Sequence, residues 1–274
     1  MRPHAPIGVF DSGVGGLSVL RALQAELPDE RFVYVADNGH APYGERDDAH
    51  VLQRSHVLAD YLRAQHHIKA LVVACNTATA AAIHTLRAAY TDLPIVGIEP
   101  ALKPALARSH TGVVGVMATR GTLNSEKFHR LLDSLEGSHR VVLQPCDGLA
   151  DAIERADADK TLALCRSYTQ AMGAFGEYAG QIDCLVLGCT HYAFAAEALQ
   201  QLIGPATALL DAGVPVAKQT RRVLAQGQAL AAPGNAQAAP TQFYSTGNVA
   251  LLNAAVQGWL HCDAQAQAIT PGGA

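Results

Sequence analysis

Charged residues are scarce in this chain. Asp, Glu, Lys and Arg make up 16% of its 274 residues, whereas an ordinary soluble domain has about 25%. The net charge of −4 provides no basic surplus to attract the phosphates of a nucleic acid, so we expect no nucleic-acid partner. Hydrophobic residues make up 49% of the chain, which excludes a disordered protein. The length predicts about two folded domains, at about 150 residues each.

Long hydrophobic runs are missing as well. No stretch reaches the roughly 18 consecutive apolar residues of a membrane-spanning helix. The first apolar run, 7–10, is interrupted by Asp11, and a signal peptide needs an apolar core of about 7–15 residues. We therefore predict a cytoplasmic protein without membrane contact, in which thiols stay reduced.

The chain has six cysteines but no Cys-x-x-Cys pair, so neither a disulfide scaffold nor the usual zinc spacing is indicated. Cys184, Cys189 and His191 are close in sequence. In an extended strand, however, the two cysteines lie about 17 Å apart, at about 3.4 Å per residue. We therefore predict no metal site. Ordinary packing is expected for four of the cysteines, which are Cys146, Cys165, Cys184 and Cys262.

Short apolar segments alternate with longer segments of helical pattern. The apolar segments are rich in Val, Ile and Leu with little polar alternation, which is typical of parallel strands buried on both faces. The predicted strands are 7–10, 31–36, 70–74, 95–98, 113–117, 141–144, 184–187 and 208–210. The predicted helices are 16–25, 47–65, 77–89, 122–134, 149–156, 159–173 and 194–201, with a further one from near 216. This alternation predicts an α/β fold with right-handed crossovers.

A weak repeat relates the two halves of the sequence. The segment LVVACNT at 71–77 resembles LVLGCTH at 185–191, and IGVFDSG at 7–13 resembles VGVMATR at 114–120. The two offsets, 114 and 107 residues, are similar. Two related α/β domains, each with one cysteine at the end of a strand, would produce this pattern. Because any two strand–helix units share such features, these segments alone leave both explanations open.

Cys75 and Cys189 occupy the same place in the repeat, at the turn from a strand into a helix. Ligands of open α/β sheets bind beyond the carboxyl ends of the strands, where the next helix offers free backbone N–H groups. We therefore expect both thiols to have a pKa below the usual value of about 8.5. The N–H groups, together with Asn76, Thr77 and Thr190, would bind a carboxylate. The alternative is that both cysteines are small core residues, but the polar residues that follow them favour the reactive interpretation.

Two further loops stand out by their composition. The segment Asp11-Ser12-Gly13-Val14-Gly15-Gly16 follows the first predicted strand, but its third glycine comes one position too early for a dinucleotide-binding fingerprint. The alternative is a tight turn that places Asp11 and Ser12 at the edge of the sheet. In Pro42-Tyr43-Gly44, the tyrosine phenol would either cap a small pocket or belong to an ordinary turn.

Taken together, six segments resemble the glutamate racemases, which are cofactor-independent members of the aspartate/glutamate racemase superfamily. These segments are 7–17, 42–44, 74–78, 97–100, 115–119 and 188–192. The resemblance spans nearly the whole chain. It implies two pseudo-symmetric, doubly wound α/β domains with mainly parallel sheets and the active site in the cleft between them. We expect the first domain at 1–98 plus 207–274 and the second at 99–206.

The resemblance implies interconversion of L-glutamate and D-glutamate by a homodimer that needs no cofactor and no metal, with D-glutamate supplied to peptidoglycan. One cysteine thiolate would remove the α-proton, and the other cysteine would protonate the opposite face of the same carbon. Cys75 would act on the D-glutamate face and Cys189 on the L-glutamate face. A two-domain repeat suits this reaction, because acid and base must lie on opposite sides of one carbon.

The resemblance also implies roles for neighbouring residues. Asp11 matches an acidic residue beside the first cysteine, His191 a histidine beside the second, and Glu154 a glutamate near the second. We include all three with the cysteines as catalytic. The match around Glu154 is weaker, because Cys146-Asp147-Gly148 replaces the family's Pro-containing stretch. The expected substrate contacts are Asp11, Ser12, Tyr43, Gly44, Asn76, Thr77, Thr119, Thr190 and His191.

Two alternative functions remain at this point. Paired cysteines also serve related racemases of aspartate, hydantoins or arylmalonates, although the segments 11–16 and 42–44 favour glutamate. A two-domain protein that binds an amino acid without catalysing a reaction would have the same fold class and domain arrangement. Exchange of the α-hydrogen with solvent deuterium separates an enzyme from such a binding module.

Overall fold

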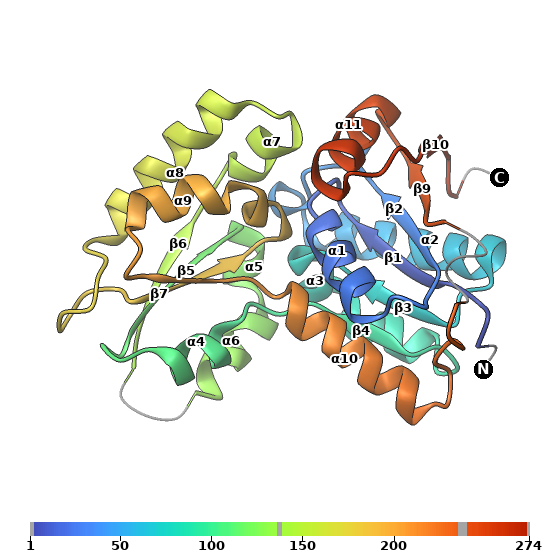
Figure 1. Cartoon of the computed structure of the whole chain (residues 1–274), viewed down its shortest axis with the longest axis horizontal. Helices are drawn as coiled ribbons and strands as arrows, with labels where there is room; N and C mark the ends of the chain where they lie inside the picture. Colours follow the sequence, from blue (N-terminus) through green and yellow to red (C-terminus); the bar gives the residue numbers. More distant parts are fainter. Residues whose placement is uncertain (1–2, 136–138, 235–239, 273–274) are drawn as a thin grey trace.

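The computed structural model describes residues 3–135, 139–234 and 240–272. They form two lobes that lie side by side (Figure 1). A six-stranded sheet with strand order β10-β9-β2-β1-β3-β4 lies in the first lobe, and a four-stranded sheet with order β6-β5-β7-β8 lies in the second. The strand pairings within both sheets are parallel. No helix in the described ranges has both the length and the apolar character needed to cross a membrane.

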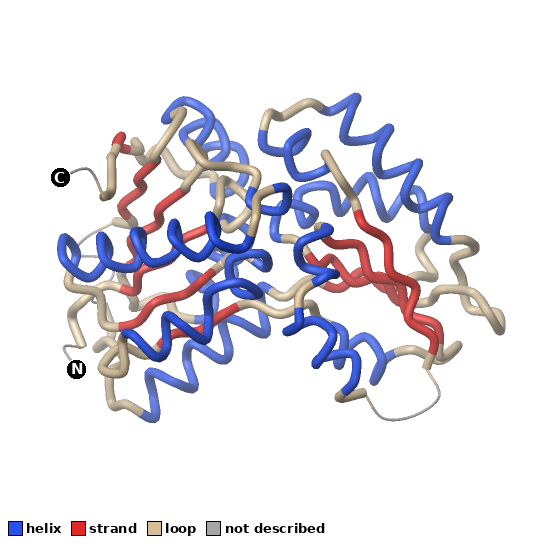
Figure 2. The backbone as a smooth tube through the Cα atoms, turned by 180° about the vertical axis from the view of Figure 1, so that it is seen from behind, coloured by secondary structure: helices blue, strands red, loops and turns tan. Residues whose placement is uncertain are grey.

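The first lobe is built on three strands that are buried along their whole length, because helices cover both faces of the sheet. These strands are β1 (Ile7–Asp11), β2 (Phe32–Ala36) and β3 (Ala70–Val73). Beyond them lie β4 (Ile95–Gly97) on one side and β9 (Gln242–Ser245) and β10 (Gln267–Ala268) on the other. One face packs against α1 (Leu17–Glu26), α10 (Gly213–Gln226) and α11 (Val249–Leu260). The other face packs against α2 (Asp48–His66) and α3 (Asn76–Ala89) (Figure 2).

The second lobe repeats this layering with four strands. They are β5 (Val113–Ala118), β6 (Arg140–Pro145), β7 (Cys184–Gly188) and β8 (Ala208–Leu210). One face packs against α4 (Leu102–Arg108), α5 (Arg120–Asn124) and α6 (Glu126–Asp133). The other packs against α7 (Leu149–Glu154), α8 (Ala158–Met172) and α9 (Ala196–Ile203). Two short 3-10 helices, η1 (Tyr43–Glu45) and η2 (Thr190–Ala195), lie in the loops that reach the site.

The internal repeat is a structural one. Strands β2-β1-β3-β4 and β6-β5-β7-β8 have the same order within their sheets. Their registers also match, because Gly8 lies opposite Leu71 in the first sheet and Gly115 lies opposite Leu185 in the second. The sequence similarity therefore reflects two equivalent four-stranded units, and the predicted pseudo-symmetric α/β fold is confirmed.

Most predicted elements are present, and the differences have local causes. The eight predicted strands are all found, with ends shifted by at most one residue. The predicted helix 122–134 is split into α5 and α6, because the Ser125 side chain accepts a hydrogen bond from Phe128 N–H and starts a new helix. Strands β9 and β10 and helices α4 and α11 were not predicted. Strand β10 follows Cys262 and pairs with β9.

The boundary between the lobes needs one correction. The segment 208–210, assigned to the first domain by the predicted boundary at 207, forms β8 and pairs with β7 of the second sheet. Helix α10 then packs on the first lobe, with Val216, Ala217 and Leu224 in its core. We propose that the chain returns to the first domain after Leu210.

Candidate active site

A cavity of about 210 Å³ lies where the carboxyl ends of strands from both sheets meet. The first lobe contributes Ser12, Tyr43, Gly44, Cys75, Asn76 and Thr77 to its lining. The second lobe contributes Thr119, Glu154, Cys189, Thr190 and His191. Both cysteines singled out in the sequence therefore reach one cavity, from opposite lobes. This is the position in which open α/β sheets bind ligands.

Cys75 follows β3 and caps helix α3. Its Sγ accepts a hydrogen bond from Ala78 N–H at 3.4 Å and contacts Ser12 Oγ at 3.8 Å. Burial raises the pKa of this thiol to about 12, with the charge of Asp11 acting in the same direction and the Ala78 N–H against it. The predicted lowering of the Cys75 pKa is therefore wrong in this state, because the loss of solvent outweighs the helix N-terminus.

Asp11 ends β1 and is fully buried behind Ser12. One carboxyl oxygen accepts hydrogen bonds from Gly13 N–H at 2.8 Å and from Ser12 Oγ at 3.3 Å. The other accepts from Thr190 Oγ1 of the second lobe at 2.9 Å. Burial raises the pKa of Asp11 to about 6, against the lowering effects of His191 and these donors. A proton on this carboxyl is therefore exchangeable near neutral pH.

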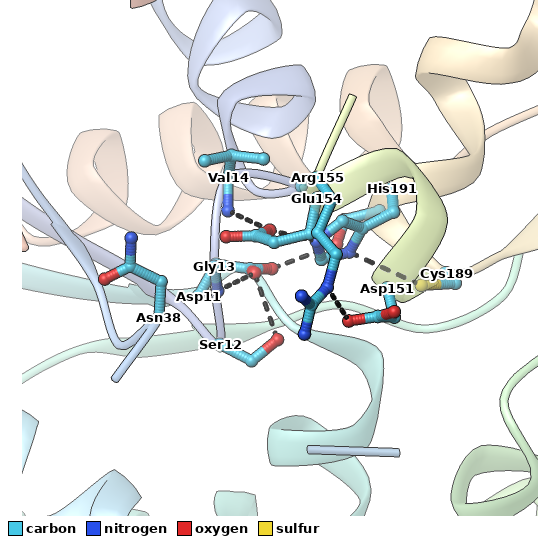
Figure 3. Close-up of polar contacts among 12 residues, drawn as sticks. Asp11, Ser12, Gly13, Val14, Asn38, Asp151, Glu154, Arg155, Cys189 and His191 are labelled. Atoms are coloured by element: carbon cyan, nitrogen blue, oxygen red, sulfur yellow. Dashed lines mark hydrogen bonds and ion pairs between the residues drawn. The ribbon is translucent and has the colours of Figure 1, made fainter. Parts of the chain in front are cut away.

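Cys189, His191 and Glu154 form a chain in the second lobe (Figure 3). Cys189 Sγ lies 3.8 Å from His191 Nδ1, and His191 Nε2 lies 2.7 Å from Glu154 Oε2. Burial opposes a charge on the imidazole. The hydrogen bonds and charges of Cys189 and Glu154 outweigh burial, so the pKa of His191 lies well above its usual value. The sulfur of the second cysteine therefore lies beside an imidazole whose raised pKa favours the protonated form.

The glycines of segment 11–16 make room for the other lobe. A Cβ on Gly13 would lie 2.3 Å from Glu154 Oε2, and a Cβ on Gly15 would lie 2.4 Å from His191 Nδ1. The neighbouring Val14 N–H donates to Glu154 Oε2 at 2.8 Å (Figure 3). The turn does place Asp11 and Ser12 at the sheet edge. Its glycines are needed because the histidine and the carboxylate of the second lobe lie directly on its backbone.

Two residues that line the cavity have buried polar atoms without a hydrogen-bond partner. Both side-chain amide atoms of Asn76 are buried without a hydrogen bond, although this residue lines the cavity. Nearby, Thr77 Oγ1 and Thr119 Oγ1 are 3.1 Å apart across the two lobes. Oε1 of Glu154 is also buried without a partner. Buried polar groups are normally satisfied, so these atoms indicate where a polar ligand binds.

Comparison with known proteins agrees with this geometry. A model of the Asp/Glu/Hydantoin racemase family matches residues 7–221. The glutamate racemase of Ectopseudomonas mendocina is 47% identical over 92% of this chain and 93% of its own. A glutamate racemase isoform of Bacillus anthracis has a TM-score of 0.86 at 29% identity, with 98% of both chains covered. The Escherichia coli glutamate racemase, solved with L-glutamate and an activator, has a TM-score of 0.79 at 29% identity over 93% of this chain and 95% of its own.

The chain belongs to the Asp/Glu/Hydantoin racemase family. The predicted resemblance and the assignment as a racemase, an isomerase, are thereby confirmed.

The cavity departs from the sequence-based expectation at one predicted contact. Tyr43 does line the cavity, and its hydroxyl donates a hydrogen bond to Asp37 Oδ2. Asp11 does not line the cavity and lies behind Ser12. Every other residue predicted as catalytic or as a substrate contact lines the cavity.

Part of the cavity wall was not predicted from the sequence. Cys146 is buried as predicted but lines the cavity as well. Asn38 and Leu251 of the first lobe and Arg120, Asp147 and Arg155 of the second are further lining residues. No local signal points to them, since the wall is assembled from distant segments. Cys165 and Cys184 are buried away from the cavity and Cys262 is half-buried, and no metal-binding cluster of His, Cys, Asp and Glu occurs among the residues described.

Proposed function

We propose that this racemase interconverts L-glutamate and D-glutamate by moving the α-proton between Cys75 and Cys189. The observation that carries the proposal is the position of the two thiols. They follow the equivalent strands β3 and β7 of opposite lobes and line one cavity. An acid and a base on opposite sides of one carbon are what inversion by proton transfer requires.

Glutamate as the substrate is supported by the relatives, which are named glutamate racemases, and by the polar groups of the cavity. Glutamate has two carboxylates and one ammonium. The unpartnered amide of Asn76 supplies a donor for carboxylate oxygens. The hydroxyls of Thr77 and Thr119, which hydrogen-bond each other here, line the same cavity. The unpartnered Oε1 of Glu154 supplies an acceptor for the ammonium.

In the direction from L-glutamate, the Cys189 thiolate takes the α-proton and the Cys75 S–H bond breaks to protonate the opposite face of the carbanion. The product is D-glutamate, with a thiol at Cys189 and a thiolate at Cys75. The imidazolium of His191 stabilises the Cys189 thiolate at the start, and the Ser12 hydroxyl connects Cys75 to Asp11. The reverse reaction uses the opposite protonation state. Positioned dipoles must lower most of the barrier, because an α-proton beside a carboxylate is far less acidic than a thiol.

We infer from the family resemblance that the enzyme is a cytoplasmic homodimer without a cofactor and that its D-glutamate enters peptidoglycan. Light scattering after size exclusion tests the dimer, with a mass near twice 28.8 kDa expected.

The decisive experiment is α-hydrogen exchange in deuterium oxide with no added cofactor. We expect either enantiomer of glutamate to racemise with incorporation of deuterium at Cα, and aspartate to react far more slowly. Cys75→Ser and Cys189→Ser should each lower racemisation by about a thousandfold or more, while Cys262→Ser, outside the cavity, should not. Binding of glutamate without exchange, or full activity in either active-site variant, would refute the proposal.

A further inference from the structure

One wall of the cavity is the short segment around Pro42-Tyr43-Gly44. Residues 41–45, here called the pocket lip, all line the cavity and include η1. The lip touches the second lobe, since a Cβ on Gly44 would lie 2.8 Å from Cβ of Thr119. The position of the lip therefore fixes both the width of the cavity and its contact with Thr119.

A buried carboxylate behind the lip collects four hydrogen bonds. Asp37 lies just after β2 and is fully buried. Its Oδ2 accepts from Tyr43 Oη at 2.5 Å and from Arg54 Nε at 3.0 Å. Its Oδ1 accepts from Arg54 Nη2 at 2.9 Å and from Thr246 Oγ1 at 2.8 Å. A bidentate guanidinium–carboxylate pair of this kind has a defined geometry as well as attraction.

These bonds join elements that are far apart in the chain. Arg54 belongs to α2, Tyr43 to the lip, and Thr246 to the connection between β9 and α11. The Tyr43 ring is 1% exposed, so the hydroxyl bond and the packing together fix where the ring lies. Nothing in this cluster contacts Cys75 or Cys189 through a hydrogen bond in the described residues.

We propose that Asp37 and Arg54 are positioning residues that hold the lip against Thr119 in the shape that binds the substrate. This inference rests on the proposed glutamate racemisation for its kinetic test. Loss of the Asp37–Arg54 pair would let the lip move and weaken substrate binding, while the two thiols and their partners stay in place. The effect should therefore appear mainly in KM.

The chain offers a matched control on the same helix. Arg63 of α2 also makes a bidentate pair, with Asp92 at 3.1 Å, but 30% of its side chain is exposed and it is remote from the lip. Arg54→Met and Arg63→Met thus remove the same group from the same helix. The double variant Asp37→Asn/Arg54→Met removes both charges of the buried pair and so avoids a lone buried carboxylate.

We expect Arg54→Met to raise KM for both enantiomers by about tenfold with kcat changed by less than about threefold, and Arg63→Met to leave both constants near those of the parent. The double variant should recover thermal stability but keep the raised KM. Hydrogen exchange of the amides of 41–45 should be faster in both Arg54 variants, which is a readout independent of catalysis.

Three results would overturn the inference. They are a fall in kcat with KM unchanged, equal effects of Arg54→Met and Arg63→Met, or a double variant with the parent's KM and the parent's exchange in 41–45. If the parent protein itself does not racemise glutamate, the proposed function fails, and the exchange of 41–45 still decides whether Asp37 and Arg54 hold the lip.

Discussion

The two halves of the site use one architecture to hold different proton carriers. In the first lobe, Cys75 contacts the Ser12 hydroxyl, which donates to Asp11. In the second lobe, Cys189 contacts His191, which pairs with Glu154. A hydroxyl passes a proton on without gaining a charge, whereas an imidazole stores one near neutral pH. The repeat therefore fixed where the carriers lie, and the residues at each position decide whether the proton is passed or stored.

The two halves also differ in how their surroundings treat charge. Burial raises the pKa of Cys75 to about 12 and that of Asp11 to about 6. In the second half, hydrogen bonds and nearby charges overcome burial and hold the pKa of His191 well above its usual value. Under the proposed mechanism, this state has a thiol at Cys75 and a cation beside Cys189, which is the combination needed to start from L-glutamate.

Each half is completed by the other lobe. Thr190 of the second lobe donates to Asp11, and Val14 N–H of the first lobe donates to Glu154. Separation of the lobes would therefore break the hydrogen bond to Asp11 in the first half and the hydrogen bond to Glu154 in the second.

Apart from substitution of the two cysteines, the largest effect is expected from Gly15→Ala. The new Cβ would lie 2.4 Å from His191 Nδ1, so the imidazole must move away from Cys189 while the first half stays intact. We expect kcat/KM to fall by about 100-fold with little change in the far-UV circular dichroism spectrum. The control is Gly258→Ala on α11, where nothing lies within 4 Å of the new Cβ. Full activity of Gly15→Ala would show that the position of His191 is unimportant.

Glu154→Gln removes the charge that supports the imidazolium but keeps the side-chain shape. The pKa of His191 should fall, because the coulombic and hydrogen-bond contributions of Glu154 raise it. We expect kcat/KM to drop by about 30-fold and the alkaline limb of its pH profile to shift to lower pH. Glu197→Gln, an exposed change on α9, should do neither. An unshifted profile would mean that His191 does not store the proton.

The parts of this site that could be predicted from the sequence are those with a local signal. Segments rich in Val, Ile and Leu predicted the strands of the two sheets. The polar residues after Cys75 and Cys189 predicted where two of these strands end. The pKa of Cys75 could not be predicted in this way. A helix N-terminus is a local feature, but the burial that outweighs it depends on both lobes closing over the thiol.

The contacts between the lobes have no local signal. Val14 and Glu154 are 140 residues apart, and the segment around Glu154 departs from the family pattern. From the sequence, Gly13 and Gly15 are predicted to lie in a turn. In the structure they must be glycines because side chains of the other lobe occupy the space of a Cβ. Strands β9 and β10 are short and partly exposed, so they lack the apolar run that marked the others.

Asp11→Asn tests the first half through stability. The pKa of Asp11 is about 6 in the folded protein against an ordinary value of 3.8, so the folded state binds the proton more tightly. Its contribution to stability is therefore greatest below pH 3.8 and is lost as the pH rises through 6. In urea unfolding, the free energy of unfolding of the variant minus that of the parent should increase by about 2 kcal/mol from pH 4.5 to pH 8. Activity should be about tenfold lower. A stability difference between variant and parent that is the same at both pH values would mean that folding does not raise the pKa of Asp11.

The smallest effect is expected from Thr190→Val, which removes the hydroxyl that donates to Asp11 from the other lobe. The Thr190 hydroxyl lowers the pKa of Asp11, so its loss should raise that pKa further and extend the decline in stability to higher pH. Since the other donors to Asp11 remain, kcat/KM should fall by only about fivefold, and Thr190→Ser, which keeps the hydroxyl, should stay within about twofold of the parent. Equal activity of the Val and Ser variants would show that Asp11 works without the second lobe. Of the two bonds that link the proton carriers across the lobes, Thr190–Asp11 and Val14–Glu154, activity would then depend on the second, and the interlock would be one-sided.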